Sequence, residues 1–384
     1  MDASVRLFRC GRRISEVVVL ALCLPQAHAA TAAPPICDGS AILTLVGIDT
    51  STGRTLFSLP AANGKASWLV ELDGDGREAR VWPDDPKGRF SGSVGPGPVL
   101  AVMPCGPSCL QPVRWQQGSW EPVGESISAP ATVTVNPTYD QTGAPWFLLL
   151  REGTAAGQAK AWAFRLEGSE WRNRGSMTIA AVGQPSALPA PQRKDGVLAG
   201  TGLFSASGPP QIWVSGLPGI SAERRGQLIA LTGTAAAYLS GDGIVYLSPD
   251  SGKSWRRSTW TPWASNGTVG IWRQGHDFWI DFPFGDSRGS LRLVWFDRRR
   301  PSEEILVLTR LTQKGDWVRL AEVPGEVKTK SNEHLPVTQI LVPQGDTWIL
   351  LSGCAATAQG SGLVLRIFDG NNVSEPRFVP LKMK

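Results

Sequence analysis

The eight residues from Ser248 to Trp255 constrain the fold of this chain more than any other stretch of its sequence. They read Ser-Pro-Asp-Ser-Gly-Lys-Ser-Trp. The short side chains of Ser248 and Asp250 can hydrogen-bond the backbone of the turn that follows them. Gly252 can adopt the positive φ that such a turn requires. An apolar run at 243–247 precedes the turn, and Trp255 can bury its ring beneath it. The stretch therefore predicts a β-hairpin.

The same string has the pattern S-x-D-x-G-x-x-W, which resembles the Asp box of the BNR-repeat β-propeller superfamily. Members of that superfamily have the sialidase-like fold, so the resemblance implies an all-β chain. In the family the motif holds a hairpin together and takes no part in the chemistry. We therefore expect Ser248, Asp250, Gly252 and Trp255 to be structural residues.

Glycine-rich turns followed by tryptophan recur along the chain, at roughly the forty-to-sixty-residue spacing of propeller blades. Such corners end at Trp120, Trp171, Trp255 and Trp317. Only the corner at Trp255 carries the complete motif. The pattern predicts a single all-β propeller of about seven four-stranded blades, with six as the alternative count. The expected units lie near residues 40–84, 88–126, 130–178, 180–222, 225–262, 265–324 and 335–380.

Residues 1–29 have the pattern of a secretory signal peptide. Four arginines come first, an apolar stretch follows at 17–24, and an Ala-His-Ala string ending at Ala29 offers a cleavage site. The apolar stretch is too short to cross a bilayer. We expect residues 30–384 to form the mature propeller domain, in the bacterial periplasm or secreted. Lipidation at Cys23 is the competing interpretation, but a leucine stands directly before it, where a small residue is usual.

The charge of the mature protein limits its partners. The predicted leader carries four arginines and two acidic residues, so the net charge falls from +5 for the whole chain to +3 after cleavage. Such a weak positive charge on an exported protein argues against a nucleic-acid partner. Charged residues make up only 18% of the chain, which fits many short strands better than long solvated helices.

Four cysteines remain after cleavage, and an even number in an exported chain favours disulfides. They are Cys37, Cys105, Cys109 and Cys354. Three pairings are open, of which Cys105 with Cys109 closes a tight local loop. Cys37 would then meet Cys354, which suits a propeller because its two termini usually join in one closing blade. By loop entropy this long closure is worth roughly 4–5 kcal/mol.

A zinc half-site at Cys105 and Cys109 is the competing interpretation of the local pair. The mature chain contains only two histidines, His276 and His334, as further nitrogen ligands. The sequence therefore predicts no metal site, and it contains no motif for an organic cofactor.

Sialidases are the best-known Asp-box enzymes, and the resemblance directs a search for their arginine triad, tyrosine nucleophile and aspartate acid/base. The family's Arg-Ile-Pro string is absent. The tyrosines Tyr139, Tyr238 and Tyr246 all precede the last third of the chain, where the nucleophile usually lies. No sialidase catalytic residue can be transferred to this sequence. His276 and Asp277 are adjacent and could serve acid–base chemistry in another glycosidase, or could be solvent-facing strand residues.

Two further groups are candidate binding residues. Trp260 and Trp263 flank a Thr-Pro pair, so a loop could present both rings to a sugar or to an apolar side chain of a partner. The alternative is that these rings fill space between blades. The arginines Arg298, Arg299 and Arg300 could bind an anion, although the glutamates that follow favour a self-neutralised surface loop.

These observations predict an exported, non-catalytic binding or scaffolding propeller of the bacterial envelope, with a protein or glycan partner. A rigid ring with variable loops is a ready recognition surface. The alternative is a glycoside hydrolase that acts in the central funnel.

Overall fold

In the computed structural model of this chain, Ala33–Lys384 form one compact unit. The predicted signal peptide lies outside the described residues. Among the described residues, no helix is long and apolar enough to cross a membrane. The structure describes residues 37, 43–60, 67–84, 92–129, 133–152, 158–180, 188–190, 192–217, 227–230, 234–239, 245–257, 279–280, 291–297, 305–311, 317–328, 334–337, 339–344, 347–357 and 360–384.

Strands that follow one another in the sequence pair antiparallel within each sheet. The N-terminal half of the chain begins with β1 (Thr44–Asp49), β2 (Arg54–Pro60), β3 (Ser67–Leu72) and β4 (Ala79–Asp84). The second sheet contains β6 (Leu100–Gly106), β7 (Cys109–Gln116), β8 (Ser119–Pro122) and β9 (Ile127–Ser128). The third contains β10 (Thr134–Tyr139), β11 (Pro145–Glu152), β12 (Gln158–Glu167) and β13 (Glu170–Ala180). The short β5 (Val94–Gly95) pairs in parallel with β1.

The C-terminal half repeats the pattern. Its sheets contain β14 (Leu188–Pro189), β15 (Gly196–Ala199), β16 (Gly202–Ser205) and β17 (Gly208–Ile212); β18 (Gln227–Ala230), β19 (Ala236–Leu239), β20 (Val245–Ser248) and β21 (Arg256–Arg257); and β22 (Trp279–Ile280), β23 (Leu291–Asp297), β24 (Ile305–Leu311) and β25 (Trp317–Pro324). A separate hairpin of β26 (Glu326–Lys328) and β27 (His334–Pro336) precedes β28 (Gln339–Gln344), β29 (Thr347–Thr357), β30 (Gly360–Phe368) and β31 (Arg377–Met383).

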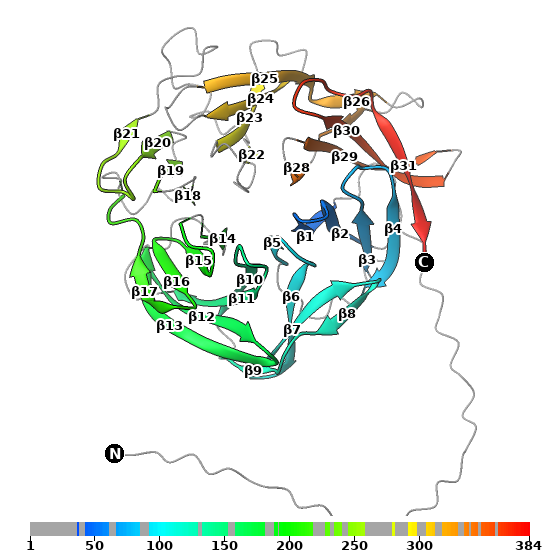
Figure 1. Cartoon of the computed structure of the whole chain (residues 1–384). Coiled ribbons are helices and arrows are strands. Elements are labelled where there is room, and N and C mark those ends of the chain that lie inside the picture. The colour runs from blue at the N-terminus through cyan, green and yellow to red at the C-terminus, as the bar shows by residue number, and fades with distance from the viewer. Residues whose placement is uncertain are drawn as a thin grey trace, which may run out of the picture. The chain divides into compact units, whose positions relative to one another are not determined.

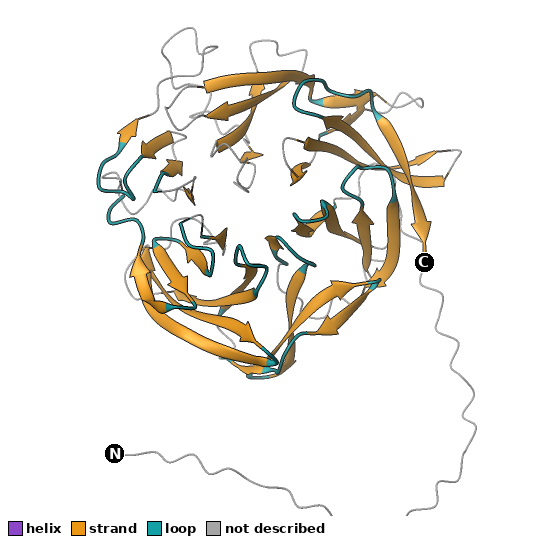
Figure 2. Cartoon of the chain, viewed as in Figure 1, coloured by secondary structure: helices purple, strands orange, loops and turns teal. Residues whose placement is uncertain are grey.

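The sheets stand side by side around a central axis (Figure 1). The first strand of each sheet, such as β10 or β14, lies near the axis, and the last, such as β13 or β17, lies at the rim. Strands and turns are the only elements drawn in the described part of the ring (Figure 2). Radial antiparallel sheets of this kind are the architecture of a β-propeller. The expected all-β propeller class is thus confirmed.

The last sheet is joined to the first by hydrogen bonds and by a disulfide. β31 pairs in parallel with β4, so the strands from β28 to β31 and from β1 to β5 form one nine-stranded sheet. Cys37 is bonded to Cys354, and both are buried. This is the long-range pairing that the sequence predicted, and Cys105 is bonded to Cys109 as well.

The hydrophobic core is divided among the spaces between neighbouring sheets. Burial alternates along β12. Its buried residues Ala159, Ala161 and Ala163 share one cluster with Trp146 of the same sheet and Phe204 of the next sheet. The small alanines leave room for these large rings, which fill the space between the two sheets. Burial of a ring of this size removes roughly 150–250 Å² of surface from water.

Candidate functional site

The candidate binding and acid–base residues lie outside the described residues and stay predictions. They are Trp260, Trp263, His276, Asp277, Arg298, Arg299 and Arg300. The described part of the chain instead shows how the turns between its strands are built and held.

The turn between β20 and β21 has the hydrogen bonds expected from its sequence. The Ser248 hydroxyl accepts a hydrogen bond from the Gly252 amide at 2.8 Å, and Gly252 has a φ of 82°. The Asp250 carboxylate accepts the amide and the hydroxyl of Ser254, at 2.9 and 2.6 Å. These bonds hold the pKa of Asp250 below its usual value, with the Ser254 hydroxyl as the main cause. The carboxylate is therefore engaged within its own turn.

Trp255 differs from the expectation. Its ring is only half-buried, and its indole N–H donates to the carbonyl of Gly216 at 2.8 Å. Gly216 follows the last strand of the preceding sheet, and the Ser215 amide likewise donates to the Ser251 carbonyl at 3.0 Å. The turn thus ties two neighbouring sheets together, because the indole has a polar edge that needs an acceptor as well as a face that packs.

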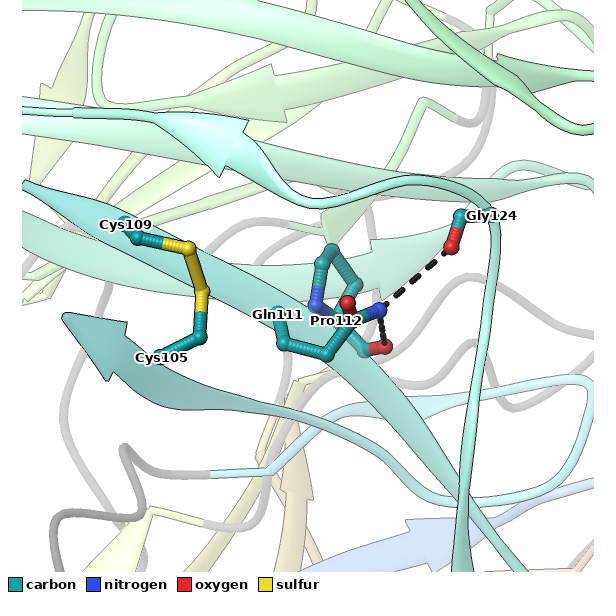
Figure 3. Close-up of a disulfide and its surroundings, with 5 residues drawn as sticks. All are labelled: Cys105, Cys109, Gln111, Pro112 and Gly124. Carbon is teal, nitrogen blue, oxygen red and sulfur yellow. Dashed lines mark hydrogen bonds between the residues drawn. A yellow bond between two sulfur atoms is a disulfide. The ribbon is translucent and has the colours of Figure 1, made fainter. Parts of the chain in front are cut away.

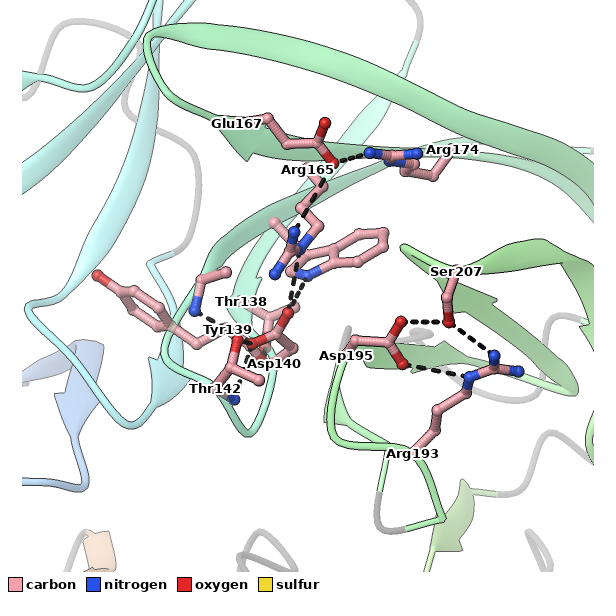
Figure 4. A network of polar contacts seen from close by, with 12 residues as sticks. Thr138, Tyr139, Asp140, Thr142, Arg165, Glu167, Arg174, Arg193, Asp195 and Ser207 are labelled. Carbon is pink, nitrogen blue, oxygen red and sulfur yellow. Dashed lines mark hydrogen bonds and ion pairs between the residues drawn. The ribbon is translucent and has the colours of Figure 1, made fainter.

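A second aspartate, Asp140, organises the turn between β10 and β11 (Figure 4). Its side chain is fully buried. It accepts the amides of Thr142 and Ala144 at 2.9 and 3.1 Å, and the indole N–H of Trp146 at 2.9 Å. The Arg165 guanidinium completes the set at 3.2 Å. A buried carboxylate is tolerated only when its oxygens are satisfied in this way.

The ion pairs continue outward from Asp140 along β12 and β13 (Figure 4). Glu167 contacts Arg165 at 3.7 Å and Arg172 at 3.5 Å, and it also pairs with Arg174. Arg165 stands directly opposite Arg172 in the register of β12 and β13, and Glu167 stands opposite Glu170. The contacts of Glu167 with Arg172 and Arg174 therefore run diagonally between the two strands, and they offset the repulsion between the like charges that face each other.

A similar but separate network holds the turn between β14 and β15. The Ser207 hydroxyl donates to Asp195 at 2.6 Å, and Arg193 approaches both residues at 3.2 and 2.7 Å. The Ser207 hydrogen bond is the main cause that lowers the pKa of Asp195. Asp195 lies immediately before β15, so the network links that turn to the turn between β16 and β17.

Aspartates close turns at one end of several sheets. One of them ends the first strand of its sheet, the others directly follow, or lie two residues after, a first or third strand, and each accepts backbone amides from the turn that comes next. They are Asp49, Asp73, Asp140, Asp250 and Asp369. Four antiparallel strands return the chain to the end where it began, so such turns fall at the same end of successive sheets. The sequence analysis missed Asp140 and Asp369, although an aspartate followed by Thr, Asn or Gly after an apolar run was the available signal.

The local disulfide lies at the opposite end. The Tyr139 hydroxyl donates a hydrogen bond to the Pro98 carbonyl at 2.5 Å. The turn at 96–98 therefore lies beside the Asp140 turn. From there β6 runs away to the hairpin that Cys105 and Cys109 close (Figure 3). The structure therefore separates an end of hydrogen-bonded aspartate turns from an end with a disulfide-closed hairpin.

Comparison with known proteins does not assign a family. No family model matches the chain, and no curated protein does. Among solved structures, the β-propeller domain of the trilobed protease from Pyrococcus furiosus is similar with a TM-score of 0.48, 10% identity, and coverage of 87% of this chain and 95% of that one. An acylaminoacyl peptidase from Pyrococcus horikoshii has a TM-score of 0.49, 10% identity, and coverage of 88% and 52%. A fungal lectin from Aleuria aurantia has a TM-score of 0.36, 11% identity, and coverage of 90% and 98%. The propeller assignment rests on the sheet topology of the chain itself.

Proposed function

We propose that this chain is an exported, non-catalytic binding or scaffolding propeller of the bacterial envelope, which recognises a protein or glycan partner. The observation that carries the proposal is the engagement of turn carboxylates. Asp140 and Asp250 direct their oxygens at donors of their own hairpins and sheet. Turns held in this way need no further ordering of their own on binding, which favours recognition.

We infer that the ring has seven blades. The described strands fall into groups that follow the predicted units closely, for example β10 to β13 at Thr134–Ala180 for the unit near 130–178. Counted in this way, the first blade is β1 to β4, the second is β6 to β9 with β5 at its inner edge, and the last is β28 to β31. The hairpin of β26 and β27 is an addition between the last two blades.

We also infer export through a leader that is cleaved near Ala29. Two disulfides support this inference, because they form and persist in oxidising compartments. Expression of the full chain in a bacterium, followed by fractionation and N-terminal sequencing, tests it. A protein that stays in the cytosol with all four mature cysteines reduced would contradict it.

The binding proposal predicts a surface that uses the loop after the Ser248–Trp255 turn. Trp260 and Trp263 are the residues we expect to contact the partner. The purified mature protein should be screened against a glycan array, and by cross-linking against envelope proteins. Trp260→Ala with Trp263→Ala should weaken the binding found by tenfold or more, with little change in Tm. The triple change of Arg298, Arg299 and Arg300 to alanine is the matched control in another part of the chain. It should leave the binding that depends on Trp260 and Trp263 unchanged.

A catalytic result would overturn the proposal. The same preparation should be incubated with a panel of chromogenic glycosides. We expect no turnover. Release of chromophore that is abolished by Asp277→Asn, while the Tm of the variant is unchanged, would identify a glycoside hydrolase instead.

A further inference from the structure

The two disulfides of this chain have opposite surroundings. Cys37 and Cys354 are 2% and 0% exposed and belong to the hydrophobic cluster that joins the first and last sheets. Cys105 is exposed and Cys109 is half-buried, at the tip of the hairpin between β6 and β7 (Figure 3). Thiol–disulfide exchange needs a thiolate to reach one sulfur of the bond, so only the hairpin disulfide is open to attack in the folded protein.

The hairpin tip has an uncovered side. Among the residues that the structure describes, a methyl group added at Gly106 would come within 4 Å only of the Cys109 Cβ, at 3.6 Å. The loop is held by the Ser108 carbonyl, which accepts the Ala129 amide at 3.1 Å. A thiol can therefore approach the tip while the loop keeps its place.

The fold around the tip does not depend on the disulfide. β6 and β7 pair from Leu100 with Arg114 to Gly106 with Cys109, and β9 pairs with the start of β7. In the loop-entropy model, closure over a sequence separation of 4 favours the folded state only about 30-fold, against more than about 3,000-fold for the separation of 317. By linkage, folding stabilises the hairpin disulfide against reduction by about the same small factor.

We propose that the tip closed by Cys105 and Cys109 is a site of thiol–disulfide exchange that accepts two electrons from the dithiol of an exported protein. One thiolate of the dithiol attacks the exposed sulfur of Cys105, the bond between the sulfurs breaks, and Cys109 leaves as a thiolate that takes up a proton. The second thiol of the dithiol then loses its proton and attacks the dithiol's own sulfur in the mixed disulfide, so the bond to Cys105 breaks and Cys105 leaves as a thiolate that takes up a proton. The dithiol becomes a disulfide, and this chain becomes a dithiol. The proposal goes beyond partner binding and does not rest on it.

The test uses the folded mature protein with both disulfides closed. It is mixed with a reduced synthetic peptide that carries a Cys-x-x-Cys dithiol, and thiols are alkylated and located by mass spectrometry. We expect one peptide to be oxidised for each protein, with new thiols at Cys105 and Cys109 and none at Cys37 and Cys354. Each disulfide is half reduced at a particular ratio of reduced to oxidised peptide. This ratio should be about 100-fold or more higher for the long-range disulfide than for the hairpin disulfide. Circular dichroism should stay unchanged.

The variant Cys105→Ser with Cys109→Ser is the control. It should keep the circular dichroism spectrum of the wild type and leave the peptide reduced. The proposal is overturned if the wild-type protein leaves the peptide reduced, if both disulfides open together, or if the hairpin disulfide opens only after denaturant is added. Peptide oxidation by the double variant would also overturn it, because the electrons would then reach the other disulfide.

Discussion

Cys37 and Cys354 are separated by 317 positions in the chain, yet their Cα atoms lie 4.8 Å apart and their sulfurs are bonded. Beside them, β31 pairs with β4. The ring is therefore closed by a covalent bond in the core and by backbone hydrogen bonds at the rim. The covalent bond constrains the unfolded chain, whereas the strand pairing acts only in the folded state.

Removal of the long-range disulfide should strongly destabilise the protein. We expect Cys37→Ala with Cys354→Ala to lower the free energy of unfolding by roughly 5–6 kcal/mol, because the unfolded chain regains the entropy of a very long loop. The matched change at Cys105 and Cys109 should cost about 2 kcal/mol. Urea unfolding followed by circular dichroism measures both. Equal losses for the two pairs would contradict the loop-entropy explanation.

Asp140→Asn should be among the most damaging single substitutions in the third sheet. The indole of Trp146 and the guanidinium of Arg165 both donate to Oδ2, whereas the turn amides donate to Oδ1, so the amide nitrogen of asparagine faces donors in either orientation. We expect a loss of about 3–5 kcal/mol in the free energy of unfolding, because the buried network loses its only negative charge and gains a donor without an acceptor. Asp369→Asn, in an exposed turn with backbone donors only, should shift the urea midpoint much less. Similar shifts would show that burial is not the cause.

Gly118→Ala should destabilise the contact between the first two sheets. Gly118 has a φ of 89°, and a Cβ there would lie 2.1 Å from the indole nitrogen of Trp82. Backbone strain and overlap together should cost roughly 2–4 kcal/mol. Gly168→Ala is the matched control, because it has a φ of 65° and no described residue within 4 Å of the added carbon. It should cost only about 1 kcal/mol. The comparison is made by thermal and urea unfolding.

Glu78 should make strand closure at the rim sensitive to acid. Hydrogen bonds from Arg80, at 2.9 Å, and Lys382, at 3.1 Å, lower the pKa of its carboxyl to about 2. A lowered pKa in the folded state means that the contribution to stability is complete above about pH 4.5 and is lost as the pH falls through about 2. We expect the protection of the β31 amides against hydrogen exchange, relative to the intrinsic rate at each pH, to fall across that window.

The variant Lys382→Ala tests the cause. It should raise the pKa of Glu78, followed by NMR titration of the side-chain carboxyl, and weaken the acid dependence of exchange in β31. Lys384→Ala is the control, since its backbone amide still donates to the Val81 carbonyl. A Glu78 carboxyl that titrates near 4.5 in the wild type would contradict the ion-pair geometry.

The turn chemistry of this chain was predictable because it depends on neighbours in the sequence. Ser248, Asp250 and Gly252 do in the structure what their spacing indicated. The acceptor of the Trp255 indole was not predictable, since Gly216 belongs to the preceding sheet, and only the packing of the two sheets brings it to 2.8 Å. The Asp140 network was missed for a related reason, because Arg165 is 25 residues away.

The sequence by itself determined the all-β class and favoured the cysteine pairing that the structure shows, because turn residues, apolar alternation and the short separation of Cys105 and Cys109 act locally. Only the tertiary structure decided the parallel pairing of β31 with β4, the insertion of the hairpin of β26 and β27, and the arginines that meet Asp140 and Glu167. The sequence does not show which strand an edge strand pairs with, or which group a charged side chain contacts. The packing of the sheets decides both, because it brings particular surfaces within hydrogen-bonding distance.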